Sequence, residues 1–452
     1  LHSQPSWLGP PSLSAGGDHE PEAADEIGLS SSEGRKQARR AHVHAHVVPA
    51  IKGFFQSIAL SDRSNRLTLQ DLLRLLSLWF KYGSNREVDA AVSNGFNTIS
   101  VDNWLHVVPQ LIARIHKSSI RERMHDLLCR IAEHHPQALI FPLAVTTTMT
   151  SGADVASRKQ CAQRVMDHMR GKRAKLVEQA LMVAKELVRV AVLWPEKWQA
   201  GLDEASRLYF AEKNIEGMLN VLAPLHKMME KGAETKHEQQ FEQQFGRELQ
   251  EALNWCNSYR RTKRESDLSQ AWDQYCHVFK KINKQMPSST TLDLATVSPR
   301  LHRAGPLELA VPGTYRAGEP LITIEGFNPK LKIIPSKQRP RKLIINGSDG
   351  RDWEFLLKGH EDIRQDERVM QLLGLINGLL ARDHETSDRD LSIRRYGVVP
   401  LSLNSGLIGW VPNHDALHVL IRDYREAHRI IVTIEHRLML QMAPDYGECP
   451  RL

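Results

Sequence analysis

The chain has 452 residues, of which 41% are apolar and 25% are charged, as in ordinary globular domains. The excess of 60 Lys and Arg over 53 Asp and Glu residues gives a net charge of +7, which is mild for this length and argues against direct nucleic-acid binding. Five widely spaced cysteines without a CxxC pair indicate neither a disulfide framework nor a zinc site, and no apolar run reaches the ~18 residues that a transmembrane helix needs.

The first part of the chain is predicted to be a disordered tail followed by short helices. Residues 1–45 are rich in Ser, Pro, Gly and acidic side chains, with too few apolar groups to offset the entropy of ordering. The alternating His42, His44 and His46 would share one side of a strand and could bind a metal there, but adventitious histidines beside a tail are the favoured interpretation. Across residues 46–178, apolar stripes at helical spacing predict a solenoid of stacked helical hairpins.

The second part of the chain changes from helical to alternating periodicity. Residues 183–285 contain four amphipathic stripes with short connections, which predicts a four-helix bundle, and the Pro-, Ser- and Thr-rich segment 286–306 is typical of a linker. Residues 307–446 are predicted to form a sheet with one packed helix at 369–380. The predicted strands are 321–324, 331–334, 343–345, 353–358, 396–401 and 407–411. The predicted fold class is therefore α+β, mostly α.

One lysine leaves a predicted apolar strand with two carboxylates within reach. Lys358 would be costly to bury alone, so we expect it to pair with Glu361 or Asp366 and to point toward an anion. A kinase lysine orients ATP phosphates in this manner. The turn at 335–342 has no Walker or GxGxxG pattern, but its hydroxyl, its exposed amides and its four cations could hold phosphates. On residue types alone, apolar and aromatic side chains in these strands are more often core.

Three motifs in this region resemble, in order and spacing, those of phosphatidylinositol 3-kinase-related kinases. They are Ser336 to Lys342, Lys358 to Met370 and Asn404 to Val411. By this resemblance Lys358, Glu361 and Asp366 form the catalytic set, in which Lys358 contacts phosphate and one of the two acids tethers it. The implied ATP site comprises Ile334, Ser336, Lys337, Pro340, Leu356, Lys358, Tyr396, Ile408, Gly409, Trp410 and Val411, of which the last three form the hinge.

The predicted bundle contains motifs that resemble the FKBP-rapamycin-binding domain of target of rapamycin (TOR) kinases. They are ELVRVAVLW at 186–194, EASRLYF at 204–210 and SQAWD at 269–273. The resemblance implies a cleft that controls substrate access and accepts rapamycin with an FK506-binding protein. Its residues would be Leu202, Ser206, Phe210, Ser269, Trp272, Asp273, Cys276 and Phe279. Cys276 stands where the family has a tyrosine, so we expect weakened rapamycin binding.

The resemblance as a whole implies a TOR-type serine/threonine protein kinase that uses ATP and Mg²⁺. By it, residues 46–178 are the end of the FAT helical solenoid, residues 183–285 are the rapamycin-binding bundle, and residues 307–446 are the kinase small lobe with the hinge and the start of the large lobe. The chain opens on Leu1, and residues 447–452 diverge from the family pattern before any catalytic or metal-binding loop, so we expect an inactive fragment whose Mg²⁺ ligands lie elsewhere. Implied partners are protein substrates, TOR complex subunits and the FK506-binding protein. The implied location is the cytoplasm, with endomembrane surfaces and the nucleus as further sites. The alternative is a non-catalytic module that binds TOR substrates or partners through the bundle, and a lipid kinase ranks last because it does not explain the bundle.

Overall fold

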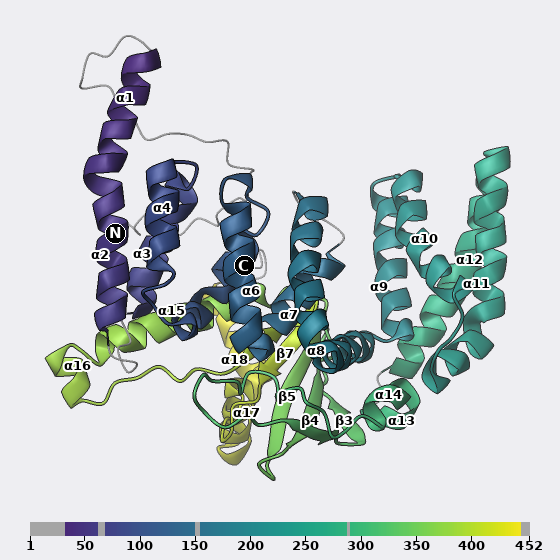
Figure 1. Ribbon diagram of the computed structural model, residues 1–452. Helices are drawn as coiled ribbons and strands as arrows, with labels where there is room; N and C mark the ends of the chain where they lie inside the picture. The colour runs from purple at the N-terminus through teal and green to yellow at the C-terminus, as the bar shows by residue number, and fades with distance from the viewer. Residues whose placement is uncertain (1–31, 62–67, 150–153, 287–289, 444–452) are drawn as a thin grey trace. The chain divides into compact units, whose positions relative to one another are not determined.

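The computed structural model describes residues 32–61, 68–149, 154–286 and 290–443. These residues are mostly helical and include one antiparallel sheet, which confirms the predicted fold class (Figure 1). The chain divides into two compact units, the first ending at Ile131 and the second beginning at Ala132. Within the described ranges, no helix combines the length and the apolar character that crossing a membrane requires.

The first unit is a succession of short helices with buried apolar stripes. In one of them, Leu72, Leu76 and Trp79 lie on one face and are at most 2% exposed. Aromatic rings fill the centre, where Phe96 meets Trp104 edge-on at 5.3 Å. The elements are α1 (Ser32–His42), η1 (Val43–Val47), α2 (Val48–Leu60), α3 (Thr68–Tyr82), α4 (Arg86–Gly95), η2 (Val101–Val107), α5 (Val108–Ala113), η3 (Ser118–Ile120) and α6 (Arg121–His134).

The prediction of a disordered tail through residue 45 is wrong from residue 32 onward. There α1 continues through the π-helical turn η1 into α2, because the stretch RKQARRA consists of strong helix formers and because Val43 and Val47 are buried. Because His42, His44 and His46 lie on this continuous helix, the strand that would have placed them on one side does not form. On the helix, His44 instead bonds Glu87 at 2.7 Å. The rest of the predicted tail, residues 1–31, lies outside the described residues.

The second unit contains the predicted four-helix bundle. Its helices are α9 (Trp194–Ser206), α10 (Ile215–Glu230), α11 (Lys236–Thr262) and α12 (Glu265–Gln285), with a π-helical turn, η4 (Arg207–Ala211), after α9. Before it come α7 (Pro136–Thr148) and α8 (Val155–Ala191), which is kinked at Arg173. Pro195 stands in the first turn of α9, where a missing N–H costs no helical hydrogen bond. The aromatic core of the bundle includes Trp198, Phe241, Phe245, Trp272 and Tyr275.

The segment predicted as a linker at 286–306 is folded in its described part. Strand β1 (Thr291–Asp293) pairs with β3 (Lys330–Ile333), and the short helices α13 (Leu294–Val297) and α14 (Pro299–His302) follow β1. The polar composition of this segment conceals four apolar side chains that become buried. They are Leu292, Leu294, Val297 and Leu301, each at most 5% exposed. Their burial supplies the free energy that a flexible linker lacks.

The sheet is antiparallel, in the order β1-β3-β4-β5-β7-β6, with β2 also paired to β4. Its remaining strands are β2 (Ile324–Phe327), β3 (Lys330–Ile333), β4 (Arg341–Gly347), β5 (Asp352–Gly359), β6 (Val398–Pro400) and β7 (Ser405–Gly409). The strand predicted at 321–324 is shifted, since Thr323 forms only an isolated bridge with Ala310. The predicted helix at 369–380 is part of α15 (Arg364–Leu380), and α16 (His384–Asp388), α17 (Leu417–Ala427) and α18 (Val432–Met442) complete the unit.

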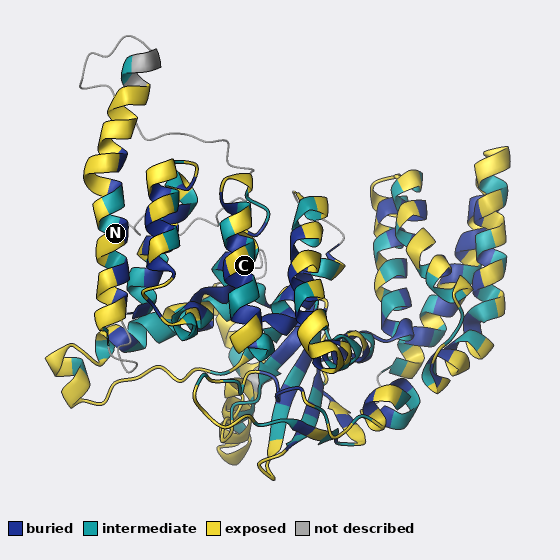
Figure 2. Ribbon diagram, viewed as in Figure 1, coloured by how far each residue is buried: buried dark blue, intermediate teal, exposed yellow. Residues whose placement is uncertain are grey.

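The two faces of the central strands differ in burial, as the alternating colours along β4 and β5 show (Figure 2). Leu343, Phe355 and Leu357 point to the buried face and are at most 3% exposed. Between them, Leu356 and Lys358 are only half-buried. Because side chains alternate along a strand, one face of this sheet belongs to the core and the other, the open face, is only half-buried.

Candidate functional site

Lys358 lies on the open face at the end of β5, paired across the ladder with Gly406 of β7. Its ammonium group forms an ion pair with Glu361, and the two side chains are 23% and 39% exposed. His360 brings the acid back toward the lysine by taking a left-handed conformation with φ of 63°. The backbone N–H of Glu361 donates to the Asn404 carbonyl at 3.2 Å, which ties this turn to the loop before β7.

Glu361 is thus the acid that pairs with Lys358 in the described structure. Asp366 lies in the first turn of α15 and is half-buried, and no ion pair between it and Lys358 occurs among the described residues. Both acids remain on the same side of the lysine in sequence. Glu361 is therefore the direct partner of Lys358, and Asp366 is a nearby acid in the sequence.

Two apolar residues predicted to contact adenine stand opposite each other on the open face. Leu356 of β5 pairs with Ile408 of β7, and both are half-buried. Tyr396 is also half-buried and precedes Gly397, whose carbonyl accepts the N–H of Gly409 at 2.7 Å. These contacts bring the predicted apolar wall and the start of the hinge to one place beside Lys358.

The hinge tryptophan is held by a basic and an acidic residue. The ammonium group of Lys342 lies 4.3 Å from the centre of the Trp410 ring and 2.8 Å from a carboxylate oxygen of Glu354. The backbone N–H of Trp410 donates to the Glu354 carbonyl at 2.9 Å. Lys342 therefore covers one face of the indole, a role that sequence reasoning missed because it counted this lysine among phosphate-binding cations.

The turn between β3 and β4 is closed by its own backbone. The N–H of Ile334 donates to the Pro340 carbonyl at 2.9 Å, and the N–H of Arg339 donates to the Ser336 carbonyl at 3.1 Å. Pro340 is buried and belongs to the base of the turn, whereas Ser336 and Lys337 are exposed at its tip. The tip is thus the part of this turn that a phosphate can reach.

Three of the four cations in the turn bind protein acids, which corrects the expectation that all four serve phosphate. Arg339 and Arg341 both pair with Glu196 of α9, and Lys342 pairs with Glu354. Lys337 is the exposed cation that remains, without an ion pair in the described part of the chain. Arg341 is not available to phosphate because its side chain is fully buried, and a buried guanidinium requires an anion from the protein.

The residues predicted to line the rapamycin cleft gather where α9 and η4 meet α12. The ring of Phe210 lies 5.3 Å from that of Trp272, and Phe210 is 61% exposed. On α12, four of the predicted residues share one helical face, at i, i+3, i+4 and i+7. These are Ser269, Trp272, Asp273 and Cys276. Three of the four, all but Trp272, are exposed.

Not every predicted cleft residue is accessible. Ser206 and Phe279 are half-buried at the edge of this surface, but Leu202 is 2% exposed and packs in the bundle core. Leu202 therefore lies beneath the surface instead of on it. Its position one turn before Ser206 on α9 explains why a periodic pattern does not distinguish core from cleft here.

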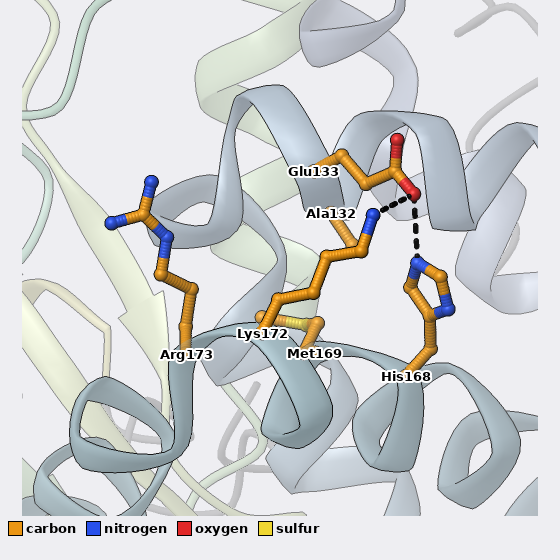
Figure 3. Close-up of a pocket in the computed structure, with 6 residues that line it drawn as sticks. All are labelled: Ala132, Glu133, His168, Met169, Lys172 and Arg173. Carbon is orange, nitrogen blue, oxygen red and sulfur yellow. Dashed lines mark hydrogen bonds and ion pairs between the residues drawn. The ribbon is translucent and has the colours of Figure 1, made fainter.

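A separate cavity of about 330 Å³ lies away from these residues, at the end of α6 and along α8 (Figure 3). Glu133 accepts hydrogen bonds there from Lys172 at 2.5 Å and His168 at 3.0 Å, and these two bonds, Lys172 first, lower the pKa of the Glu133 carboxyl. Glu133 is thus engaged by two side chains of α8. Its lining is completed by Ala132, Met169 and Arg173.

Two family models match this chain. Residues 186–284 match the FKBP12-rapamycin binding domain, and residues 352–451 match phosphatidylinositol 3- and 4-kinase. The first range contains the end of α8 and nearly all of the bundle, and the second begins at β5 and includes Lys358, Glu361 and the hinge.

Curated relatives match most of this chain. It is 55% identical to the serine/threonine-protein kinase TOR of Oryza sativa subsp. japonica over 90% of its length, and 52% identical to that of Arabidopsis thaliana over 90%. It is 51% identical to the serine/threonine-protein kinase mTor of Drosophila melanogaster over 89%. The chain spans 16% of the length of each of these relatives.

Solved structures of a more distant protein share the fold. The open conformation of CtTel1 superposes with a TM-score of 0.53 at 17% identity, covering 86% of this chain and 12% of that one. A structure titled FAT and kinase domain of CtTel1 gives a TM-score of 0.52 with the same coverage of this chain. At this identity the likeness concerns the fold alone.

Proposed function

Since the chain belongs, over 90% of its length, to the TOR family of serine/threonine protein kinases, we propose that its sheet binds ATP in a kinase that phosphorylates serine and threonine residues of proteins. The chain spans 16% of the length of its TOR relatives, so the activity of the whole protein is part of this proposal. The observation that carries it is the Lys358–Glu361 ion pair beside the apolar pair Leu356 and Ile408.

The open face provides a separate group for each part of ATP. Lys358 would donate hydrogen bonds to phosphate oxygens, and Glu361 would hold its ammonium group in place. The exposed Ser336 and Lys337 would contact the phosphates from the turn above. Leu356 and Ile408 offer an apolar surface to the adenine ring.

The hinge has one donor left for the adenine edge. The N–H groups of Gly409 and Trp410 already donate to the carbonyls of Gly397 and Glu354. The N–H of Val411 has no such partner among the described residues, so it would donate to adenine. The indole of Trp410, which also has the His414 ring 5.0 Å away, would lie beside the base.

Mg²⁺ would accompany ATP and neutralise phosphate charge. The described residues include no group of three or more His, Cys, Asp or Glu side chains placed to hold a metal ion. By the family resemblance, we propose that the metal ligands come from catalytic and metal-binding loops of the kinase outside the described residues. Lys358 would supply the positive charge that this part of the chain contributes.

The bundle surface supports a second candidate function, that of a binding module. Phe210 is 61% exposed beside Trp272, and large exposed aromatic side chains commonly mark protein or ligand contacts. We propose that this surface binds rapamycin with an FK506-binding protein, and protein substrates or TOR complex subunits, in the cytoplasm. A chain that binds these partners and no nucleotide would be the non-catalytic alternative.

ATP binding by the 452-residue chain tests the proposal. We expect saturable binding of a fluorescent ATP analogue, displaced by ATP, and a loss of about tenfold or more in affinity for Lys358→Met. Lys330→Met removes an exposed lysine of β3 and is the matched control. The proposal fails if the chain shows no saturable binding, or if the Lys358 and Lys330 variants bind alike.

A further inference from the structure

Glu196, in the first helical turn of α9, binds the loop between β3 and β4. The Glu196 carboxylate of α9 accepts a hydrogen bond from Arg339 Nε at 3.2 Å and also pairs with Arg341. These arginines flank Pro340, at the base of the turn that presents Ser336 and Lys337. One acid of the bundle thus binds both arginines at the end of this turn.

This contact is buried and rigid on the bundle side. The side chains of Arg341, Glu196 and Arg339 are 0%, 9% and 15% exposed. Glu196 also accepts the N–H of Leu193 at 3.0 Å, which fixes its position at the start of α9. Because an unpaired buried charge is costly, the Glu196 carboxylate fixes the positions of the two arginine side chains.

The surrounding groups leave the arginines as the main cationic partners of Glu196. His237 of α11 and His360 lie near enough to interact with it, but burial lowers the pKa of both imidazoles, which disfavours their protonated forms. Lys197 is also nearby, and burial lowers its pKa. In the described structure it forms no ion pair with Glu196.

The same junction contacts the strand of the phosphate-binding lysine. Gly359 directly follows Lys358, and a Cβ atom built on it would lie 2.7 Å from the carbonyl oxygen of Ala191 at the end of α8. This distance leaves no room for a side chain, so the backbone of β5 packs directly on the α8–α9 junction. The turn and the lysine are therefore both placed against one short segment, residues 191–196.

We propose that Glu196 is a positioning residue for nucleotide binding. By holding Arg339 and Arg341 it sets the place of Ser336 and Lys337 relative to Lys358, without touching the nucleotide itself. The inference rests on the proposed ATP site. It predicts that neutralising Glu196 loosens the turn and weakens nucleotide binding while the bundle stays folded.

The test uses the full 452-residue chain and two measurements, nucleotide affinity and amide hydrogen exchange. Glu196→Gln keeps the length of the side chain and an acceptor for Leu193 N–H, and it removes the charge. We expect affinity for the fluorescent ATP analogue to fall about tenfold. We also expect exchange in peptides spanning 330–342 to accelerate by about tenfold, with peptides of 241–256 in α11 unchanged.

Two further variants isolate the contact. Glu204→Gln neutralises an acid of the same helix that pairs with Arg207 on the surface, and it should leave both readouts unchanged. Arg341→Met should resemble Glu196→Gln, and the double variant should lose less affinity than the sum of the two single losses, because both remove one interaction.

The outcomes separate this proposal from the ATP site on which it rests. If Lys358→Met weakens binding but Glu196→Gln behaves as Glu204→Gln does, the positioning role is refuted and the ATP site stands. If the unmodified chain binds no nucleotide, both are refuted. If Glu196→Gln accelerates exchange throughout the bundle, the variant Arg339→Gln tests the proposal instead, because it leaves the ion pair between Glu196 and Arg341 intact. Unchanged exchange in the turn and unchanged nucleotide affinity in that variant would overturn the proposal.

Discussion

Glu361 pairs with Lys358 in the turn after β5, which contains the left-handed residue His360, whereas Asp366 lies in the first turn of α15 without such a pair in the described structure. The ion pair keeps the ammonium group on the open face of the sheet, next to Leu356. At the proposed ATP site, this ion pair would orient the lysine before phosphate arrives and so reduce the ordering that nucleotide binding must impose.

Replacing Glu361 with Gln is expected to weaken ATP binding about tenfold, because Lys358 loses the carboxylate that orients it. Calorimetric titration of the chain with ATP measures the effect. Asp366→Asn is the matched control and should change affinity less than Glu361→Gln does. The reverse order of the two effects would show that the observed ion pair is not the one that matters for binding.

Removing the cation over the hinge indole is expected to weaken adenine binding. Lys342→Met abolishes the contact with Trp410 and the ion pair with Glu354, so the indole loses a cation–π contact of about 0.5–1 kcal/mol that fixes its orientation. If that orientation is needed to bind the base, affinity should fall by at most roughly twofold to fivefold. Titration with adenosine and with ATP should show the same loss, since the contact concerns the base. Lys342→Arg keeps a cation over the ring and should bind nearly as the unmodified chain does.

Local patterns were enough to predict the parts of the site that depend on periodicity. The alternation along β5 places Leu356 and Lys358 on one face, and the structure confirms that this face is open. The helical stripe through Trp272 and Tyr275 likewise predicts a bundle core, which both residues join. Such patterns depend only on the geometry of a single element.

Contacts between distant segments could not be predicted in this way. Glu196 and Arg341 are 145 positions apart, and nothing in either neighbourhood distinguishes this acid from the many surface acids. The choice between Glu361 and Asp366 depended on the positive φ of His360, which non-glycine residues seldom adopt. The ordered segment after the bundle was missed because Leu292 pairs with Leu331 of a strand that follows it.

Restoring an aromatic side chain at position 276 is expected to strengthen rapamycin binding. Cys276 is exposed one turn after Trp272, so Cys276→Tyr would extend the surface formed with Phe210. An aromatic contact of about 0.5–1.5 kcal/mol corresponds to roughly twofold to tenfold in affinity. Calorimetry with rapamycin-loaded FK506-binding protein measures it, with Cys276→Ser as control. Nanomolar affinity of the unmodified chain would contradict the expected weakness.

His226 is buried in the bundle between aromatic residues. Its Nε2 atom lies 2.8 Å from the Tyr275 hydroxyl, and its ring meets Trp198 edge-on at 5.0 Å. Burial lowers the pKa of His226 from 6.5 to about 4, so the folded bundle keeps this imidazole neutral. The unfolded chain, in which the ordinary pKa applies, takes up a proton first as the pH falls.

The contribution of His226 to the free energy of unfolding is therefore expected to be constant above about pH 6.5. It should decrease as the pH falls toward 4, by up to about 3 kcal/mol, because the unfolded chain gains the proton first. Urea unfolding followed by tryptophan fluorescence between about pH 7.5 and pH 5 measures the decrease. His226→Gln can still bond the Tyr275 hydroxyl but does not titrate, so its stability should depend less on pH. His237 and His360 shift in the same direction through burial and are present in both proteins, so only the difference between the two curves reports on His226. Parallel curves would mean that protonation of His226 does not destabilise the bundle.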